Sequence, residues 1–165
     1  MCNRKNWIAV SVLILGFAMS VSIAQAQRQD FEALGCDAAT YSVVHSSPEV
    51  AIRSADAKGI MQSTHEGKFL ENWTMHSVYV TKSGGGKASW NGLGKFMAPD
   101  GEFVIGEFSG NSESGGSTWN IFYGTGKWKG IKGELRGKVV RAGKPNVDGT
   151  SQFCEKYVGW IELPK

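Results

Sequence analysis

The chain has 165 residues, of which 41% are hydrophobic, and its 18 basic residues nearly balance its 15 acidic ones. This length is sufficient for one domain with a buried core and insufficient for two ordinary domains. The balanced charge and the lack of any block of basic residues exclude an electrostatic nucleic-acid binder.

The N-terminal stretch has the order of a bacterial-type signal peptide. Arg4 and Lys5 precede an uncharged, mostly apolar run over 7–23, and Ala24-Gln25-Ala26 has the small-x-small pattern after which signal peptidase cleaves. The apolar run is short for a membrane span of about 20 residues, so cleavage is favoured over anchoring. We therefore expect a periplasmic or secreted protein with no membrane span after removal of residues 1–26.

Two cysteines remain after cleavage, because Cys2 leaves with the signal peptide. Cys36 and Cys154 lie near opposite ends of the mature chain. In an oxidising compartment such a pair predicts a disulfide that ties the N-terminal segment to the last strand. Two unpaired buried thiols are the alternative, and the sequence does not say whether the two residues are near enough to bond.

The rest of the chain has the frequent turn residues of an all-β protein. Of the 22 glycines in the full sequence, 20 lie from residue 57 onward. We expect 27–56 to form an N-terminal segment packed on the barrel, with a short helical or irregular connection at 48–56, and 57–165 to form the main part of the β-barrel domain. Strands are predicted over 40–45, 58–64, 68–80, 87–97, 102–109, 117–123, 131–141 and 151–162. Eight strands predict a single antiparallel barrel.

The clearest alternation lies in the strand expected over 131–141, where one face is charged. Its packed face is predicted to carry Ile131, Gly133, Leu135, Gly137 and Val139. Glycine among inward residues lets a strand bend sharply or leaves space in a narrowing barrel. The same arrangement of small and large residues recurs in Trp90, Gly92, Gly94 and Phe96.

Turn residues separate these strands. Pro99-Asp100-Gly101 predicts a hairpin, because proline sets the turn and glycine takes positive φ. The glycines at 84–86 and the Ser/Gly-rich stretch at 111–116 predict mobile loops, where a lid or mouth would lie.

The stretch from Gly124 to Gly130 (GTGKWKG) has the look of a phosphate-binding glycine loop. Such a loop opens a helix and places Ser or Thr after its lysine, whereas here Trp128 follows Lys127 and a strand is expected next. We therefore predict a tight β-connection in which Trp128 plugs one end of the barrel.

The same stretch carries a family resemblance. Residues 123–133 (YGTGKWKGIKG) resemble the "GTGKFxGxxG" stretch of the allene oxide cyclase and dirigent-like barrels. The resemblance implies an eight-stranded, calycin-type barrel and, given the signal peptide, a bacterial member of this superfamily. In plants those barrels cyclise an unsaturated epoxide or steer the coupling of phenoxy radicals by holding a flexible substrate. No catalytic pattern of these families carries over to residues of this chain.

Two acidic residues are candidates for catalysis. The period of two predicts one strand face with Phe69, Glu71, Trp73, Met75 and Tyr79, and another with Phe103, Ile105 and Glu107. In a dry cavity the charged form of Glu71 or Glu107 would be disfavoured, which suits a proton donor or base. The alternative is that the strand is partly exposed, or that a bulge turns the acid outward.

Other chemistry is not favoured by the sequence. The histidines, His45, His65 and His76, lack the spacing of a known zinc motif, so we expect no metal site. We also expect no cofactor, and with Cys36 and Cys154 bonded to each other there is no candidate nucleophile.

Five tryptophans remain after cleavage, which is a generous supply for this length. Their simplest role is to form the core, but some can line a cavity for a lipid-like or aromatic molecule. The predicted ligand-binding residues are Trp73, Met75, Tyr79, Trp90, Phe103 and Trp119.

Three functions stay open at this stage. The first is an exported barrel that binds a small hydrophobic or aromatic molecule. The second is a cofactor-free isomerase or cyclase that uses Glu71 or Glu107 in the same cavity. The third is a structural or interaction module with a filled interior, in which an exposed strand face pairs subunits into a homo-oligomer.

Overall fold

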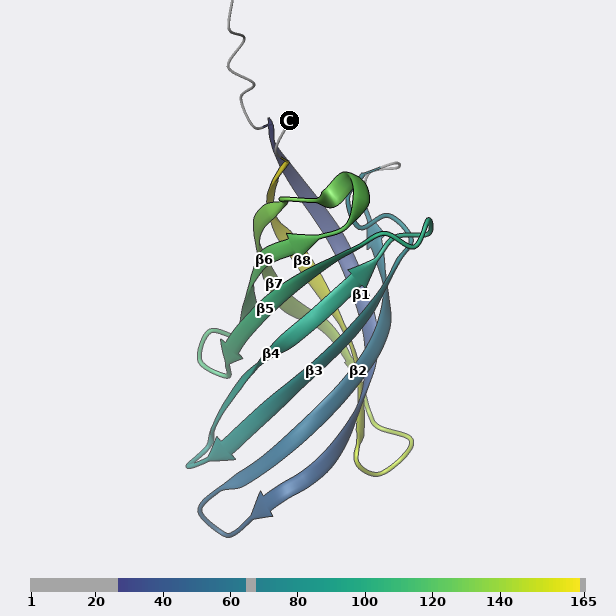
Figure 1. Cartoon of the computed structure of the whole chain (residues 1–165). Coiled ribbons are helices and arrows are strands. Elements are labelled where there is room, and N and C mark those ends of the chain that lie inside the picture. The colour runs from purple at the N-terminus through teal and green to yellow at the C-terminus, as the bar shows by residue number, and fades with distance from the viewer. Residues whose placement is uncertain (1–26, 65–67, 164–165) are drawn as a thin grey trace, which may run out of the picture.

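The computed structural model describes residues 27–64 and 68–163, and it is an all-β protein with one closed barrel of eight antiparallel strands. Each strand pairs with the next, and β8 pairs with β1 to close the sheet (Figure 1). The strands are β1 (Gln27–Ser46), β2 (Ala51–Ser63), β3 (Trp73–Gly84), β4 (Lys87–Met97), β5 (Phe103–Asn111), β6 (Gly116–Gly124), β7 (Lys132–Gly143) and β8 (Thr150–Leu163). The predicted fold class is confirmed, while the predicted signal peptide, 1–26, lies outside the described residues.

Strands β1 and β2 are much longer than the sequence indicates. Residues 27–46 are a strand of the barrel itself, and the connection expected at 48–56 is reduced to 47–50. The inward side chains of β1 include those of Ala33 and Ala39, which are fully buried but small. Its outward side chains include Leu34, which is exposed. Small residues inside and an apolar residue outside weaken the alternation that marks a strand.

The strand predicted over 68–80 begins later, at Trp73. Residues 68–72 form a turn in which Leu70 and Asn72 have positive φ angles of 68° and 55°. Because the turn interrupts the period of two, Glu71 does not share the strand face of Trp73 and Met75.

One end of the barrel is filled by aromatic side chains. Phe69, Trp73 and Trp128 contact one another edge to face, with ring centroids 5.0 to 5.4 Å apart. Trp128 ends the short 3-10 helix η1 (Gly126–Trp128), which lies at the upper end of the barrel in Figure 1. The prediction that Trp128 plugs a barrel end is confirmed, and strand β7 follows in place of the α-helix of a phosphate-binding loop. We call this the closed end.

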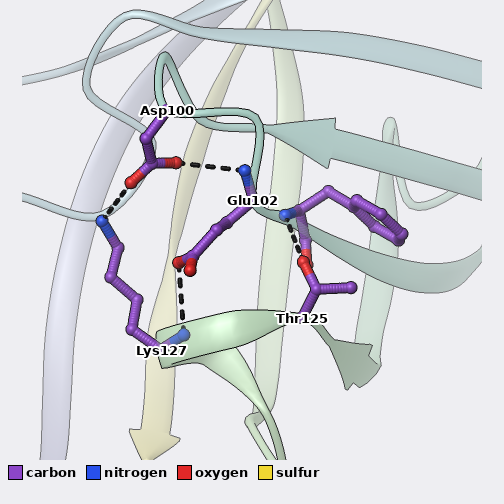
Figure 2. Close-up of polar contacts among 5 residues, drawn as sticks. Asp100, Glu102, Thr125 and Lys127 are labelled. Atoms are coloured by element: carbon purple, nitrogen blue, oxygen red, sulfur yellow. Dashed lines mark hydrogen bonds and ion pairs between the residues drawn. The ribbon is translucent and has the colours of Figure 1, made fainter.

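A polar clasp joins two turns at the closed end (Figure 2). Thr125 accepts a hydrogen bond at Oγ1 from the backbone N–H of Phe103 over 2.9 Å. Glu102 accepts one from the backbone N–H of Lys127, and the Lys127 ammonium lies 2.6 Å from Asp100. The hairpin predicted at Pro99-Asp100-Gly101 is present, with φ of 87° at Gly101. The clasp holds this hairpin against the η1 turn.

Cys36 and Cys154 are directly opposite each other where β1 and β8 close the barrel. They form a disulfide, with 4.1 Å between their Cα atoms. The predicted pairing is confirmed. The bond spans 118 residues of sequence and covalently fixes the register of the first and last strands.

Candidate functional site

The end of the barrel opposite the closed end is hollow. A cavity of about 290 Å³ lies among inward side chains toward the turns after β1, β3, β5 and β7. Seven of the eight strands contribute to its wall. The lining residues are Asp37, Tyr41, Met75, Ser77, Tyr79, Thr81, Trp90, Phe108, Ser117, Trp119, Val139, Ala142, Ser151, Phe153, Glu155 and Tyr157.

Aromatic rings form one side of the cavity. Phe108 and Trp119 are stacked, with centroids 4.1 Å apart and planes 19° from parallel. Tyr79 contacts Phe108 edge to face at 5.6 Å. The indole N–H of Trp119 donates a hydrogen bond to Ser117 over 3.1 Å, which fixes the ring orientation. This wall presents flat, polarisable surface to a guest.

Three hydroxyl groups meet nearer the mouth of the cavity. The Tyr41 oxygen lies 3.2 Å from that of Tyr79 and 3.1 Å from that of Ser151. Burial is the main cause that raises the pKa of Tyr79 above its usual range, and the hydrogen bond with Tyr41 raises it further. The Tyr79 hydroxyl therefore stays protonated, and the array can donate a hydrogen bond to a ligand.

Two carboxyl groups enter the same cavity from adjacent strands. Asp37 is on β1 and Glu155 is on β8, where the buried Tyr157 hydroxyl donates a short hydrogen bond to Glu155. Burial, followed by the charge of Glu155, raises the pKa of Asp37 to about 7. Burial also raises the pKa of Glu155, and the hydrogen bond from Tyr157 partly opposes this. A carboxyl group with a pKa near neutrality can give or take a proton at physiological pH.

Four of the predicted ligand-binding residues line this cavity: Met75, Tyr79, Trp90 and Trp119. Trp73 lies instead in the core of the closed end. Phe103 is on the outer side of the barrel, where the Lys95 ammonium lies 4.2 Å from its ring centroid. Phe103 also contacts Tyr123 there.

The candidate catalytic residues Glu71 and Glu107 do not line the cavity. The face predicted for Phe103, Ile105 and Glu107 is the outer one, because β5 buries Val104, Gly106 and Phe108. Glu107 is exposed there. Glu71 is in the turn before β3, where its Oε2 atom is buried without a hydrogen-bond partner among the described residues.

Sequence reasoning missed the carboxyl pair and the hydroxyl groups of Tyr41, Ser151 and Tyr157. A signal was present, since Asp37 and Glu155 each directly follow a cysteine of the predicted disulfide. Successive side chains of a strand point to opposite faces. If Cys36 and Cys154 pair on the outside of neighbouring strands, the residue after each must point inward.

Within the described residues, no group of three or more His, Cys, Asp or Glu side chains could hold a metal ion. The absence of a metal and of a cofactor stays a prediction. Within the same residues, no helix is long and apolar enough to cross a membrane.

The sequence matches no model of a known protein family and no curated protein. Its fold is similar to that of two pterocarpan synthase dirigent proteins. PsPTS1 superposes with a TM-score of 0.57 at 12% identity, covering 84% of this chain and 97% of that protein. GePTS1 superposes with a TM-score of 0.53 at 12% identity, covering 98% of this chain and 100% of that protein. The chain therefore has a dirigent-like barrel, while the resemblance to allene oxide cyclases stays a prediction.

Proposed function

We propose that this chain is an exported barrel that binds a small aromatic molecule in its open-ended cavity. The observation that carries the proposal is the cavity itself, with stacked aromatic rings on one side and carboxyl and hydroxyl groups converging on the same space. Ligand pockets combine an apolar wall with a few polar groups that orient the guest. The confirmed disulfide is consistent with an oxidising compartment outside the cytosol.

The size of the cavity limits the ligand. Its volume of about 290 Å³ lies at the small end of the range of ligand pockets, which is roughly 300–1,000 Å³. One or two rings with short substituents therefore suit it better than a long acyl chain. The dirigent neighbours, which are pterocarpan synthases by name, support an aromatic rather than a lipid-like substrate.

Native mass spectrometry of the mature protein purified from its own periplasm tests this function. We expect added mass that is lost on denaturation and that is absent from Thr81→Phe, because Thr81 lines the cavity and the larger ring would fill it. Thr118→Phe is the matched control, since Thr118 is exposed on the outer side of β6. A bare protein that also fails to bind any member of a panel of phenols and indoles would contradict the proposal.

A second candidate is a cofactor-free isomerase or cyclase, and the observation that favours it is the carboxyl pair. The raised pKa of Asp37 equips it to take a proton from one atom of a bound molecule and return it to another, with Glu155 beside it. Asp37→Asn should then abolish turnover of an identified substrate even at a saturating substrate concentration. Turnover that survives in both Asp37→Asn and Glu155→Gln would remove this candidate.

The two acids predicted from the sequence, Glu71 and Glu107, can be tested in the same turnover assay. Glu71→Gln and Glu107→Gln test the acids predicted from sequence, and we expect neither to affect turnover because neither lines the cavity. The third hypothesis, a structural module, assumes a filled interior, and side chains fill the barrel only at the closed end. Pairing of subunits through an outer face stays a prediction, which sedimentation of the mature protein would test.

A further inference from the structure

The charge of the cavity indicates the class of molecule it prefers. Two acids, Asp37 and Glu155, are among its lining residues, and within the described part of the chain no lysine, arginine or histidine lines it. A buried carboxylate without a cationic partner is costly, so such groups are normally paired or neutralised. The cavity therefore has two acids and no basic side chain among its described lining residues, so a cationic partner for them would have to be part of a ligand.

Neighbouring basic residues do not neutralise the pair. Lys156 follows Glu155 along β8, but it points to the outside, where its ammonium lies 2.8 Å from Glu32. Among the described ion pairs, none includes Asp37 or Glu155. Among the side chains that the structure describes, the neutral Tyr157 hydroxyl is the only hydrogen-bond donor to Glu155.

The opposite wall is also suited to a cation. Trp119 and Phe108 present a stacked pair of rings, and Trp90 and Tyr79 add further rings to the same cavity. The faces of aromatic rings attract ammonium groups, and the attraction strengthens when water is excluded. A carboxylate and an aromatic face across one small space make a site for an organic cation.

We propose that the preferred ligand of this cavity is an aromatic amine in its protonated form, with the ammonium group against Asp37 and Glu155 and the ring against Trp119 and Phe108. The inference rests on the proposed function and deepens it by naming the ligand class. Anionic aromatic acids are disfavoured by the same two carboxyl groups. Neutral phenols or alcohols of the same shape retain the ring contacts but lack the charge-assisted hydrogen bond.

Binding of a cation should be coupled to proton release. Titratable groups that face Asp37 are Glu155 and Tyr157 on β8, Tyr41 on β1 and Tyr79 on β3. Burial raises the pKa of Tyr79 and of Tyr157 above the usual range, so these two hydroxyls stay neutral near pH 7. A positive charge beside the pair favours the ionised carboxylates, so a proton held by Asp37 in the empty cavity leaves when the amine enters. Affinity for the amine should therefore rise between pH 6 and pH 8, and affinity for a neutral analogue should not.

Three small probes of matched shape test the inference: 2-phenylethylamine, 2-phenylethanol and phenylacetate. By titration calorimetry at pH 8, we expect the amine to bind at least about tenfold more tightly than the alcohol, which is the order of a charge-assisted hydrogen bond, and phenylacetate to bind most weakly. Asp37→Asn and Glu155→Gln should each reduce the ratio of amine to alcohol affinity and leave the alcohol affinity nearly unchanged. Glu107→Gln, which removes an exposed carboxylate outside the cavity, should change neither.

Each outcome has a distinct meaning. Wild-type protein that binds the alcohol as tightly as the amine would overturn the preference for cations and leave the proposed aromatic site standing. Failure of all three probes, together with a bare protein in native mass spectrometry, would overturn both proposals. Calorimetry of the wild type at pH 6.5 in two buffers of different ionisation enthalpy is independent of any variant. Proton release with the amine alone supports the inference, and its absence contradicts it.

Discussion

Tyr41 and Tyr79 meet across strand β2, with their hydroxyl oxygens 3.2 Å apart and their rings nearly perpendicular at 88°. The register explains the contact, because both residues pair with Ala55, one from each side. Ala55 is buried and small, so the two larger rings can close over it. One short side chain in β2 thus allows β1 and β3 to share a hydrogen bond at the mouth of the cavity.

Tyr41→Phe should weaken this mouth while leaving the ring contact in place. The change removes the oxygen that joins Tyr79 to Ser151, so we expect the free energy of unfolding to fall by about 1–2 kcal/mol. Urea denaturation followed by fluorescence measures the difference. Tyr123→Phe is the matched control, since Tyr123 is exposed on the outer face. Equal effects of the two changes would contradict a role for the hydroxyl array.

The disulfide should contribute much of the stability of the barrel. Its loop spans 118 residues, and the chain-entropy estimate for a loop of that order is about 4–5 kcal/mol. The double variant Cys36→Ala/Cys154→Ala should therefore have a much lower denaturation midpoint in urea. A reducing agent should produce the same shift in the wild type and none in the double variant. Unchanged midpoints would show that the hydrogen-bonded pairing of β1 with β8 is sufficient.

The sequence predicted the number of strands because glycine and turn residues separate them so regularly. It did not predict the length of β1, whose inward positions hold small residues such as Ala33, Gly35 and Ala39. A period-of-two signal requires contrast between faces, and β1 has little. The same lack of contrast between the two faces of β1 is why the inward position of Asp37, an acid of the cavity, was not predicted.

The sequence left the orientation of Glu107 open for a related reason. In β5, the outward residues Phe103 and Ile105 are apolar and half-buried, while Gly106 is among the inward ones. A slip of one residue moves every side chain of a strand to the opposite face. Only the pairing partners of β5 in the closed barrel settle which face is inside. By contrast, Trp90 and Trp119, which the sequence predicted as ligand-binding residues, line the cavity.

Gly94 is required to leave room for Trp119. A Cβ atom at position 94 would lie 2.5 Å from the nearest atom of the Trp119 ring, which is stacked on Phe108 and cannot move freely. Gly94→Ala should destabilise the fold by about 1–3 kcal/mol, as overpacking usually does, and should shift the fluorescence of the buried indole. Gly143→Ala is the control, because its nearest neighbour would be 3.7 Å away. A neutral Gly94→Ala would show that the aromatic wall is loosely packed.

The clasp at the closed end contains a partly buried hydrogen bond and an exposed ion pair, and their contributions to stability can be compared. Thr125→Val keeps the side-chain shape but leaves the Phe103 N–H without its acceptor, so we expect a loss of about 1–2 kcal/mol. Lys127→Met removes the ion pair with Asp100, which is exposed to solvent and screened, so we expect little change. Thermal unfolding of both variants beside the wild type makes the comparison. The opposite order of effects would mean that the ion pair, not the threonine, holds the hairpin.

The cavity acids should give the barrel an unusual dependence of stability on pH. The folded state raises the pKa of Asp37 from 3.8 to about 7, so between these values it binds a proton that the unfolded chain has released. Stability is therefore greatest at the acidic side of this window and is lost as pH rises toward 7 and above. The full shift corresponds to about 4 kcal/mol at about 1.4 kcal/mol for each pKa unit, and we expect about half of this because solvent reaches the cavity.

Urea denaturation of the wild type at pH 5 and pH 8 measures this loss. Asp37→Asn, which cannot ionise, should abolish most of it and should be more stable than the wild type at pH 8 by about 2 kcal/mol. Asp30→Asn serves as the control, because Asp30 is an exposed residue of the same strand and is not among the cavity lining. Glu155→Gln should act in the same direction as Asp37→Asn, since burial raises the pKa of Glu155 as well. If the wild type and Asp37→Asn lose stability equally between pH 5 and pH 8, the Asp37 carboxyl is already ionised in the folded barrel at pH 5, and the cavity holds its charge without help from a ligand.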